Sequence, residues 1–362
     1  MTGRGVDQIL PHPSGPALHE PFAHSALEYV ALAEQTNGPI PRPVDFDYIW
    51  GDALEEFART RPAARIVNLE TAITRSRAWE HKGINYRMNP ANVPCLTAAG
   101  IDCCVLANNH VLDWGHAGLE QTLATLDAAG IATAGAGEDA AKAAAPAVLA
   151  VSGGGRVLVF ACGDRSSGIP HDWAAKKHKP GVNLLPDLSD RTVEAIGAQV
   201  DAARRPDDIV IVSVHWGGNF GYEIPAAQRR FAHGLVDRAG ADIVHGHSSH
   251  HPKGIEVYRG RAIFYGCGDL INDYEGIHGK AAYRGELSLM YFATFARSTA
   301  GAARLERLEM SPMRMRRFRL ERPSPDDAKW LCEVLARESR RLGVDVVLDQ
   351  NGRLRAHWAA DT

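Results

Sequence analysis

Short apolar runs alternate with longer amphipathic stretches over most of the chain, and this alternation predicts an α/β fold. The apolar runs expected to form strands are Ala64 to Leu69, Ile101 to Leu106, Asp208 to Val214 and Ala241 to Val244. The helical spacing of apolar residues predicts helices over Asp52 to Thr60, Ala117 to Ala128, Leu188 to Ala203 and Ala226 to Ala239. Gly130 and Gly240 follow two of these helices at the position of a C-terminal cap. This order predicts parallel strands joined by crossover helices.

Two pairs of apolar runs are joined by glycine-containing turns, which predicts antiparallel hairpins within the same fold. The pairs are Ala147 to Val151 with Arg156 to Ala161, and Ile255 to Tyr258 with Ala262 to Tyr265. Two mixed sheets packed between helical layers is the architecture that this combination favours. We expect a main domain over residues 1–300 and a strand and helix extension over residues 301–362 packed on the same domain.

Two long segments lack a clear period and are expected to be irregular loops that wall a pocket, the Pro-rich residues 11–45 and residues 166–186. Four arginines, at positions 314, 316, 317 and 319, alternate with apolar residues. That alternation favours an exposed edge strand over a nucleic-acid patch. Residues 326–341 have the pattern of a terminal amphipathic helix.

The composition is that of a soluble globular protein, because 45% of the 362 residues are hydrophobic and 23% are charged. A formal net charge of -3 gives no general electrostatic reason to bind nucleic acid or an anionic membrane. No apolar run reaches the length of a membrane span, and the first residues do not form a signal peptide. The six cysteines lack metal-knuckle spacing and are expected to be reduced core residues. The sequence as written therefore predicts a cytoplasmic protein.

Polar residues cluster immediately after the four predicted strands, and the carboxyl ends of such strands face the ligand crevice of an α/β sheet. The residues in question are Asn68, Glu70, Asn108, Asn109, His110, His215, His247 and His250. Imidazole, carboxylate and amide groups suit a divalent ion such as Zn, Mn or Fe, but they suit acid–base catalysis equally well. Each cluster of polar residues, taken alone, could also be an ordinary turn or contain a buried structural histidine. Because all four clusters follow predicted strands, one shared functional site is favoured.

The ordered motifs resemble the CapA family, which is named for poly-γ-glutamate capsule synthesis and is similar to the calcineurin-like metallophosphatases. The resemblance covers roughly residues 1–295 and rests on "VNLETAIT", "LANNHVLDWG" and the segment from "VHWGGNFGYEIP" to "GHSSHHPKGIEVYRGRAIFYGCGDL". It implies a four-layer α/β/β/α sandwich of two mixed sheets with a site at the strand ends. The family's first strand normally ends in Gly-Asp-Val-Met, and we expect that strand and its aspartate to be absent from the sequence as written.

Site residues follow from the resemblance, position by position. The implied metal ligands are Asn68, Glu70, Asn109, His215, His247 and His250. The implied catalytic groups are His110 as general acid or oxyanion partner, Asp113 as its orienter, and His250. On its own, Asp113 could equally cap the helix that begins near Gly115. Substrate contacts are expected from Arg4, Asn108, Asn109, Trp216 and Asn219.

Two further departures from the family bear on the metal. Asn68 stands where classical metallophosphatases carry aspartate, and Ser248-Ser249 replaces a common His-Pro pair. Because carboxylates are few, we expect at most one weakly bound divalent ion (Mn, Zn or Fe), or none.

Three functions stay open at this point. A metal-assisted hydrolase of amide, peptide or phosphate-ester substrates, linked to poly-γ-glutamate synthesis or release, is the leading expectation. A metal-independent peptide Cα-epimerase of the same fold is the second. A non-catalytic polymer-binding module is the third. In each case the expected partner is a peptide-like or poly-γ-glutamate chain and not nucleic acid.

Overall fold

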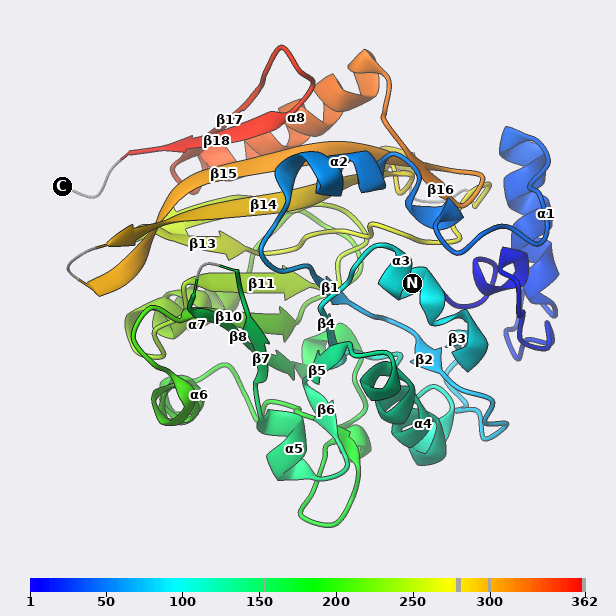
Figure 1. Cartoon of the computed structure of the whole chain (residues 1–362), viewed down its shortest axis with the longest axis horizontal. Coiled ribbons are helices and arrows are strands. Elements are labelled where there is room, and N and C mark those ends of the chain that lie inside the picture. Colours follow the sequence, from blue (N-terminus) through cyan, green and yellow to red (C-terminus); the bar gives the residue numbers. More distant parts are fainter. Residues whose placement is uncertain (153, 278–280, 299–300, 360–362) are drawn as a thin grey trace.

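The computed structural model describes residues 1–152, 154–277, 281–298 and 301–359 and shows a mixed α/β protein with several sheets (Figure 1). Within these residues there are eight α-helices: α1 Ala26–Asn37, α2 Ala53–Thr60, α3 Pro94–Ala98, α4 Gly115–Ala128, α5 Ala140–Ala144, α6 Asp190–Ala203, α7 Ala226–Asp237 and α8 Pro325–Arg340. The helices predicted near residues 52, 117, 188, 226 and 326 are all confirmed. Gly130 and Gly240 adopt positive φ angles of 72° and 68°, as expected of residues that follow a helix end.

A three-stranded parallel sheet contains the first two predicted strands. Its order is β1-β4-β5, with β1 Ile66–Asn68, β4 Cys103–Val105 and β5 Ala132–Ala134. The register places Asn68 beside Val105, so β1 and β4 end at the same edge of the sheet. Cys103 and Val105 belong to one apolar cluster and Cys104 and Leu106 to another, because successive side chains of a strand face opposite ways.

A six-stranded sheet contains the other two predicted strands and both predicted hairpins. Its order is β12-β13-β11-β10-β8-β7, with β7 Ala147–Ala150, β8 Arg156–Gly163, β10 Ile209–His215, β11 Ile243–His247, β12 Ile255–Tyr258 and β13 Arg261–Phe264. Strands β8, β10, β11 and β13 are parallel, whereas β7 and β12 pair antiparallel with their hairpin partners. In β10 and β11, His215 pairs with His247, so both strands end at one edge.

An antiparallel sheet is formed by the last part of the chain. Its order is β14-β15-β18-β17, with β14 Leu287–Ser298, β15 Gly301–Arg316, β17 Val344–Leu348 and β18 Leu354–Trp358, and β16 Arg319–Glu321 also pairs with β15. Two small sheets, of β2 Ala72–Ile73 with β3 Arg87–Met88 and of β6 Ala136–Gly137 with β9 Gly181–Val182, complete the strands of the described residues.

The expectation that the arginines near residue 314 lie on an exposed edge strand is wrong for Arg314, which lies in β15 between Leu287 of β14 and Glu321 of β16. It holds for Arg319, which lies in β16, a strand that pairs only with β15 in the described part of the chain. The arginines form ion pairs with acidic residues: Arg314 pairs with Asp327, and Arg316 and Arg317 pair with Glu321.

Three apolar clusters hold these layers together. One joins the three-stranded sheet, the six-stranded sheet, β14, β15 and α8, through residues such as Val105, Val159 and Leu308. A second lies between the other face of the six-stranded sheet and helices α6 and α7 (Figure 1). The third packs α4 and the N-terminal segments on the outer face of β4. Burial of these apolar surfaces is the main force that positions the strand ends.

The expectation that residues 11–45 form an irregular loop also needs correction. Residues 11–45 are not wholly irregular, because α1 begins after Ser25, whose side chain and that of Glu28 form a capping box.

The six cysteines are free, and five of them are buried. No helix among the described residues has the length and apolar character needed to cross a bilayer. The predicted domain boundary at residue 300 lies outside the described residues and stays a prediction.

Candidate functional site

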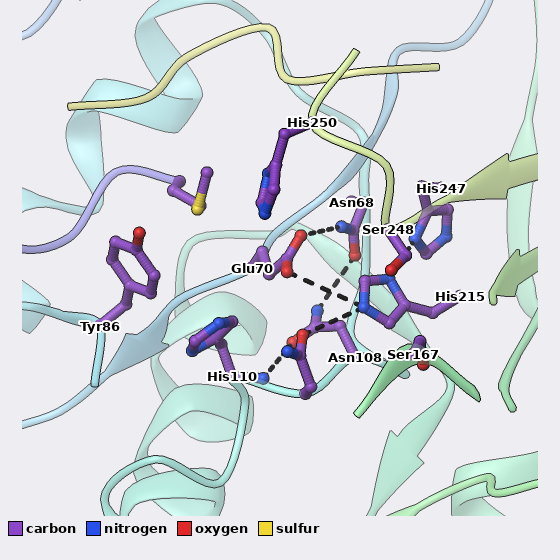
Figure 2. A network of polar contacts seen from close by, with 12 residues as sticks. Asn68, Glu70, Tyr86, Asn108, His110, Ser167, His215, His247, Ser248 and His250 are labelled. Atoms are coloured by element: carbon purple, nitrogen blue, oxygen red, sulfur yellow. Dashed lines mark hydrogen bonds and ion pairs between the residues drawn. The ribbon is translucent and has the colours of Figure 1, made fainter. Parts of the chain in front are cut away.

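The polar residues that follow β1, β4, β10 and β11 converge at one place (Figure 2). Glu70 lies two residues beyond β1, and its carboxylate accepts a hydrogen bond from Asn68 Nδ2 at 3.0 Å. His215 at the end of β10 approaches Glu70 from the other side, with Nε2 3.8 Å from Glu70 Oε1. These contacts bring the predicted site residues at the ends of β1 and β10 together, while their chemical roles stay predictions.

Glu70 is buried and ionised. Burial by itself would raise the pKa of this carboxyl group, but the imidazoles of His215, His110 and His250 around it hold the pKa below its ordinary value. Its carboxylate supplies the negative charge at the centre of the cluster.

Asn108 braces the loop after β4. Its Nδ2 donates to Asn68 Oδ1 and to the carbonyl of Leu69, both at 3.0 Å, and its Oδ1 accepts from the backbone N–H of His110 at 3.1 Å. The side chain of Asn108 is fully buried, and its three hydrogen bonds connect the ends of β1 and β4. Its expected contact with substrate stays a prediction without geometric support.

Asn109 faces His215 directly. Asn109 Oδ1 lies 3.1 Å from His215 Nε2, and on the other side of the same ring Nδ1 lies 2.8 Å from Nδ1 of His247. Burial lowers the pKa of His215 to about 4, so this imidazole is neutral at neutral pH. A neutral ring leaves one nitrogen with a lone pair, and either a proton donor or a cation can occupy the space before Nε2.

His110 forms a side-chain pair with Asp113. Its Nδ1 lies 2.7 Å from Asp113 Oδ2, while Lys82 Nζ lies 2.7 Å from the other carboxylate oxygen. Lys82 also donates to the carbonyl of Asn109 and so ties this pair to the cluster. The carboxylate orients the imidazole, as an orienting residue of a general acid or base does.

His250 forms a second imidazole–carboxylate pair. Its Nδ1 lies 2.9 Å from Asp269 Oδ2, and its backbone N–H donates to the carbonyl of Asn219 at 2.9 Å. Although burial lowers the pKa of His250, the adjacent Asp269 carboxylate outweighs that effect and raises the pKa to about 9. The ring is therefore an imidazolium at neutral pH, which suits the binding of an anion better than the binding of a metal. Asn219 acts here through its main chain.

Two tyrosines lie between the His110–Asp113 pair and the His250–Asp269 pair. Tyr86 meets the His110 ring edge to face with centroids 4.7 Å apart, and Tyr274 meets His250 in the same way at 5.4 Å. The two hydroxyl groups lie 3.1 Å from each other. The tyrosines therefore form a wall that runs from one imidazole to the other, and Figure 2 shows Tyr86 opposite Glu70.

A cavity of about 1260 Å³ opens beside the cluster. Its polar end is lined by Asn68, Glu70, His247, Ser248 and Asp269, and it continues between β1 and β14. Residues 166–186 lie next to the site, because Ser166 Oγ accepts from the N–H of Gly217 and the Trp173 ring lies 5.0 Å from Lys82 Nζ. Neither residues 11–45 nor residues 166–186 line this cavity, so the expectation that both wall it is not supported.

Two expected substrate contacts lie elsewhere. The guanidinium of Arg4 is buried and bonded to Asp273 through two nitrogens, at 2.6 and 2.8 Å, and also to Glu20 and Tyr29. The indole of Trp216 packs in the apolar cluster under α6 and α7, and its N–H donates to the carbonyl of Tyr265. The proposed contacts of Arg4 and Trp216 with substrate stay predictions that the geometry does not support.

A family model described as bacterial capsule synthesis protein PGA_cap matches residues 1–274. The chain belongs to this family. The predicted CapA membership is confirmed, because CapA proteins of two bacilli are among the relatives of this PGA_cap chain.

Relatives of this PGA_cap protein fall at two levels of similarity. A protein of Mycobacterium tuberculosis (strain H37Rv) named "Probable polyglutamine synthesis accessory protein" is 47% identical over 363 aligned positions, which cover 100% of this chain and 94% of the relative. "PGA biosynthesis protein CapA" of Bacillus subtilis (strain 168) is 31% identical over 57% of this chain and 52% of its own length. "Capsule biosynthesis protein CapA" of Bacillus anthracis is 29% identical over 53% of this chain and 45% of its own length.

The PGA_cap site also contains residues that the sequence did not single out, namely Lys82, Tyr86, Ser213, Asp269 and Tyr274. Asp269 follows soon after a strand, which is a signal that could have been used. Lys82 and Tyr86 lie in the connection between two short strands, and Ser213 lies inside a buried strand, so neither local pattern nor spacing marks them.

Proposed function

We propose that this protein is a CapA-like accessory protein of polyglutamate synthesis that hydrolyses an amide bond within a glutamyl chain. The printed names of the relatives, which refer to polyglutamine, PGA and capsule synthesis, support the pathway. The observation that carries the reaction is the placement of two imidazole–carboxylate pairs, His110–Asp113 and His250–Asp269, around the buried Glu70.

The two imidazole–carboxylate pairs have different roles in amide hydrolysis. His110, oriented by Asp113, exchanges a proton with the attacking water or the departing nitrogen. The imidazolium of His250 and the ammonium of Lys82 offer positive charge to the carboxylates of a glutamyl substrate and to the developing oxyanion. The wall of Tyr86 and Tyr274 shields the reacting groups from bulk water.

The donor set of Asn109, Glu70 and His215 would suit one divalent cation and not two. Asn109 Oδ1 and Glu70 Oε1 lie 3.1 and 3.8 Å from His215 Nε2, and ligands that each sit about 2.1 Å from one ion are separated by roughly 3 to 3.5 Å. Glu70 is the only carboxylate of this trio, and no group of three His, Cys, Asp or Glu residues suited to a metal occurs in the described part of the chain. We infer one weakly held ion, which would supply Lewis-acid polarisation of the scissile carbonyl.

We also propose that the fold is the four-layer α/β/β/α sandwich of the metallophosphatases. The position of α6 and α7 on one face of the six-stranded sheet supports this assignment. So does the apolar cluster shared by the inner faces of the sheets, with α4 beyond β4.

The test uses a synthetic γ-linked glutamate hexamer, with an α-linked hexamer for comparison. The purified chain is incubated with each peptide in D₂O, with zinc or manganese or with EDTA, and the products are measured by mass spectrometry. We expect shorter γ-linked fragments, faster release with a divalent ion, and loss of release in His110→Asn but not in the distant control His233→Asn.

Other outcomes would replace this proposal. Deuterium at Cα without chain cleavage and without added metal would assign the Cα-epimerase function, because a base and an acid around one carbon exchange that proton without hydrolysis. Hexamer that binds but stays unchanged would assign a polymer-binding module.

A further inference from the structure

The cavity beside the histidine cluster is bounded by the edges of two strands. In the part of the chain that the structure describes, β1 pairs only with β4 and β14 pairs only with β15. Consecutive residues line the cavity on both sides, namely 64–70, which include β1, and 289–295 of β14. A strand that presents one face lines a cavity with every second residue, as β11 does with Ile243, His245 and His247. The consecutive residues therefore indicate that β1 and β14 present unpaired edges to a slot between them.

The two edges belong to one layer of the fold. Side chains of β14 alternate between two of the apolar clusters, because Tyr291 packs on the cluster shared by the sheets and Phe292 packs on the cluster that holds α4. Side chains of β1 alternate between the same two clusters, with Ile66 on the first and Val67 on the second. An extended segment in the slot would face both clusters in turn. Each of its positions therefore favours an apolar side chain, as in strands that are buried on both faces.

The slot fits a strand better than a small molecule. Its volume of about 1260 Å³ exceeds the roughly 300 to 1000 Å³ of most small-molecule sites. Seven residues of extended chain, at about 3.3 Å each, span roughly 23 Å. Main-chain groups along both edges can pair with an inserted backbone on its two sides. A γ-linked glutamyl chain matches the slot poorly, because its amide spacing differs from that of a strand and because each unit carries a carboxylate that apolar walls disfavour.

The end of the slot near α2 is basic and open to solvent. Seven arginines line the slot there: Arg59, Arg61, Arg65, Arg307, Arg322, Arg353 and Arg355. Four carboxylates form ion pairs with five of these arginines, namely those of Glu55, Glu56, Glu309 and Asp349. Arg65 donates to the carbonyl of Ala99 and Arg61 is an exposed residue after α2, and neither forms an ion pair among the described contacts. The side chains of Arg307 and Arg322 are 60% and 57% exposed. Positive charge therefore exceeds negative charge at the open end of the slot.

We propose that the slot is a docking site for an extended segment of a partner protein, with roughly seven apolar residues and an acidic flank. The apolar residues add as a strand between β1 and β14, and the acidic flank meets the arginines near α2. Parallel alignment with β1, as in its own sheet, places this flank at the amino end of the segment. A second copy of the chain is a poorer occupant, because the exposed large hydrophobic residues of its described part are scattered. This docking goes beyond the proposed hydrolysis and does not depend on it.

The test uses a fluorescein-labelled synthetic peptide of three aspartates followed by roughly seven alternating valines and leucines. Its binding to the full chain is measured by fluorescence polarisation, and hydrogen–deuterium exchange locates the bound peptide. We expect saturable binding and slower exchange of the main-chain amides of β1 and β14. A proline in the middle of the apolar run should abolish binding, because proline cannot donate to a strand ladder.

Variants of the chain test the basic end of the slot. Arg61→Glu combined with Arg307→Glu should weaken binding of the acidic peptide at least tenfold, because like charges would then meet. Arg238→Glu is the matched control, because this arginine lies on the surface in an ion pair with Asp190 and does not line the slot. Its affinity for the peptide should equal that of the wild type.

Other outcomes overturn the proposal. Equal binding of the proline peptide, or unchanged exchange of β1 and β14, rules out strand addition. Displacement of the peptide by the γ-linked hexamer assigns the slot to the glutamyl chain, and a dimer of the chain alone with slow exchange at both edges assigns it to a second copy. A peptide that ends in Gly-Asp-Val-Met and binds more tightly, without dependence on the arginines, assigns it to the family's first strand. Because these comparisons change the ligand and not the chain, they stay decisive if a variant does not fold.

Discussion

The pairing of His250 with Asp269 predicts a specific response to Asp269→Asn. Burial lowers the pKa of His250, and the Asp269 carboxylate at 2.9 Å reverses this effect and raises the pKa to about 9. The amide introduced by this substitution would keep a hydrogen-bond acceptor but remove the charge, so burial would then dominate. We expect the pKa of His250 to fall below its ordinary 6.5 in the variant.

The size of the effect follows from the two values. At about 1.4 kcal/mol for each pH unit, a pKa of about 9 in place of 6.5 represents roughly 3 kcal/mol of preference for the imidazolium in the folded state. Because the pKa is raised on folding, this contribution is present below pH 6.5 and is lost as the pH rises through about 9. The stability advantage of the wild type over Asp269→Asn should therefore shrink by roughly 3 kcal/mol between pH 6 and pH 10.

Two measurements test this prediction. NMR titration of His250 gives its pKa in each protein, and urea denaturation at pH 6 and pH 10 gives the difference in the free energy of unfolding. Asp201→Asn, an exposed carboxylate of α6, is the control and should show no such trend. A wild-type His250 that titrates near 6.5, or a stability difference that is independent of pH, would refute the reasoning.

Three further predictions concern single carboxylates. Glu70→Gln removes the one charge of the proposed cation trio, and zinc affinity measured by calorimetry should fall at least tenfold, while unchanged affinity would place the ion elsewhere. Asp113→Asn leaves His110 without its charged partner, and cleavage of the γ-linked hexamer should slow by roughly a hundredfold or more with little change in KM. Asp273→Asn leaves a buried guanidinium without its main partner, and the free energy of unfolding from urea denaturation should fall by about 3 to 5 kcal/mol. The same change at Asp190, whose ion pair is on the surface, should have little effect.

The main strands and helices could be predicted from the sequence because their signals are local. The continuous apolar run before Leu106 and the glycines after α4 and before β11 mark element type and ends without any knowledge of the neighbours. Helix α1 was missed because surrounding prolines dominate its segment, although Ser25 and Glu28 carry a capping signal. The interior position of Arg314 was missed because its pairing with Leu287 of β14 depends on residues outside the local pattern.

The site shows the same division between local and distant information. Glu70, His110 and His215 follow predicted strands, and parallel strand ends meet at one edge, so their convergence could be predicted. The hydrogen-bond partners that determine the chemistry of these three residues could not be predicted from the sequence. Lys82 lies on an irregular segment, and Ser213 looks like any small residue of a buried strand, until the packing places each within bonding distance of the cluster.

The ion pair of Arg4 with Asp273 has a consequence for the order in which the chain folds. The two residues are 269 positions apart, and during synthesis the first residues emerge long before residue 273 of 362 is made. Until then the Arg4 side chain has no carboxylate at position 273 to bury against, so the first residues cannot complete their native contacts. The loop that brings Asp273 also brings Asp269, the partner of His250. Burial of Arg4 and assembly of the histidine cluster therefore both require that residues 269–273 have been synthesised, and nascent chains that end before this loop should remain open to proteolysis around Arg4.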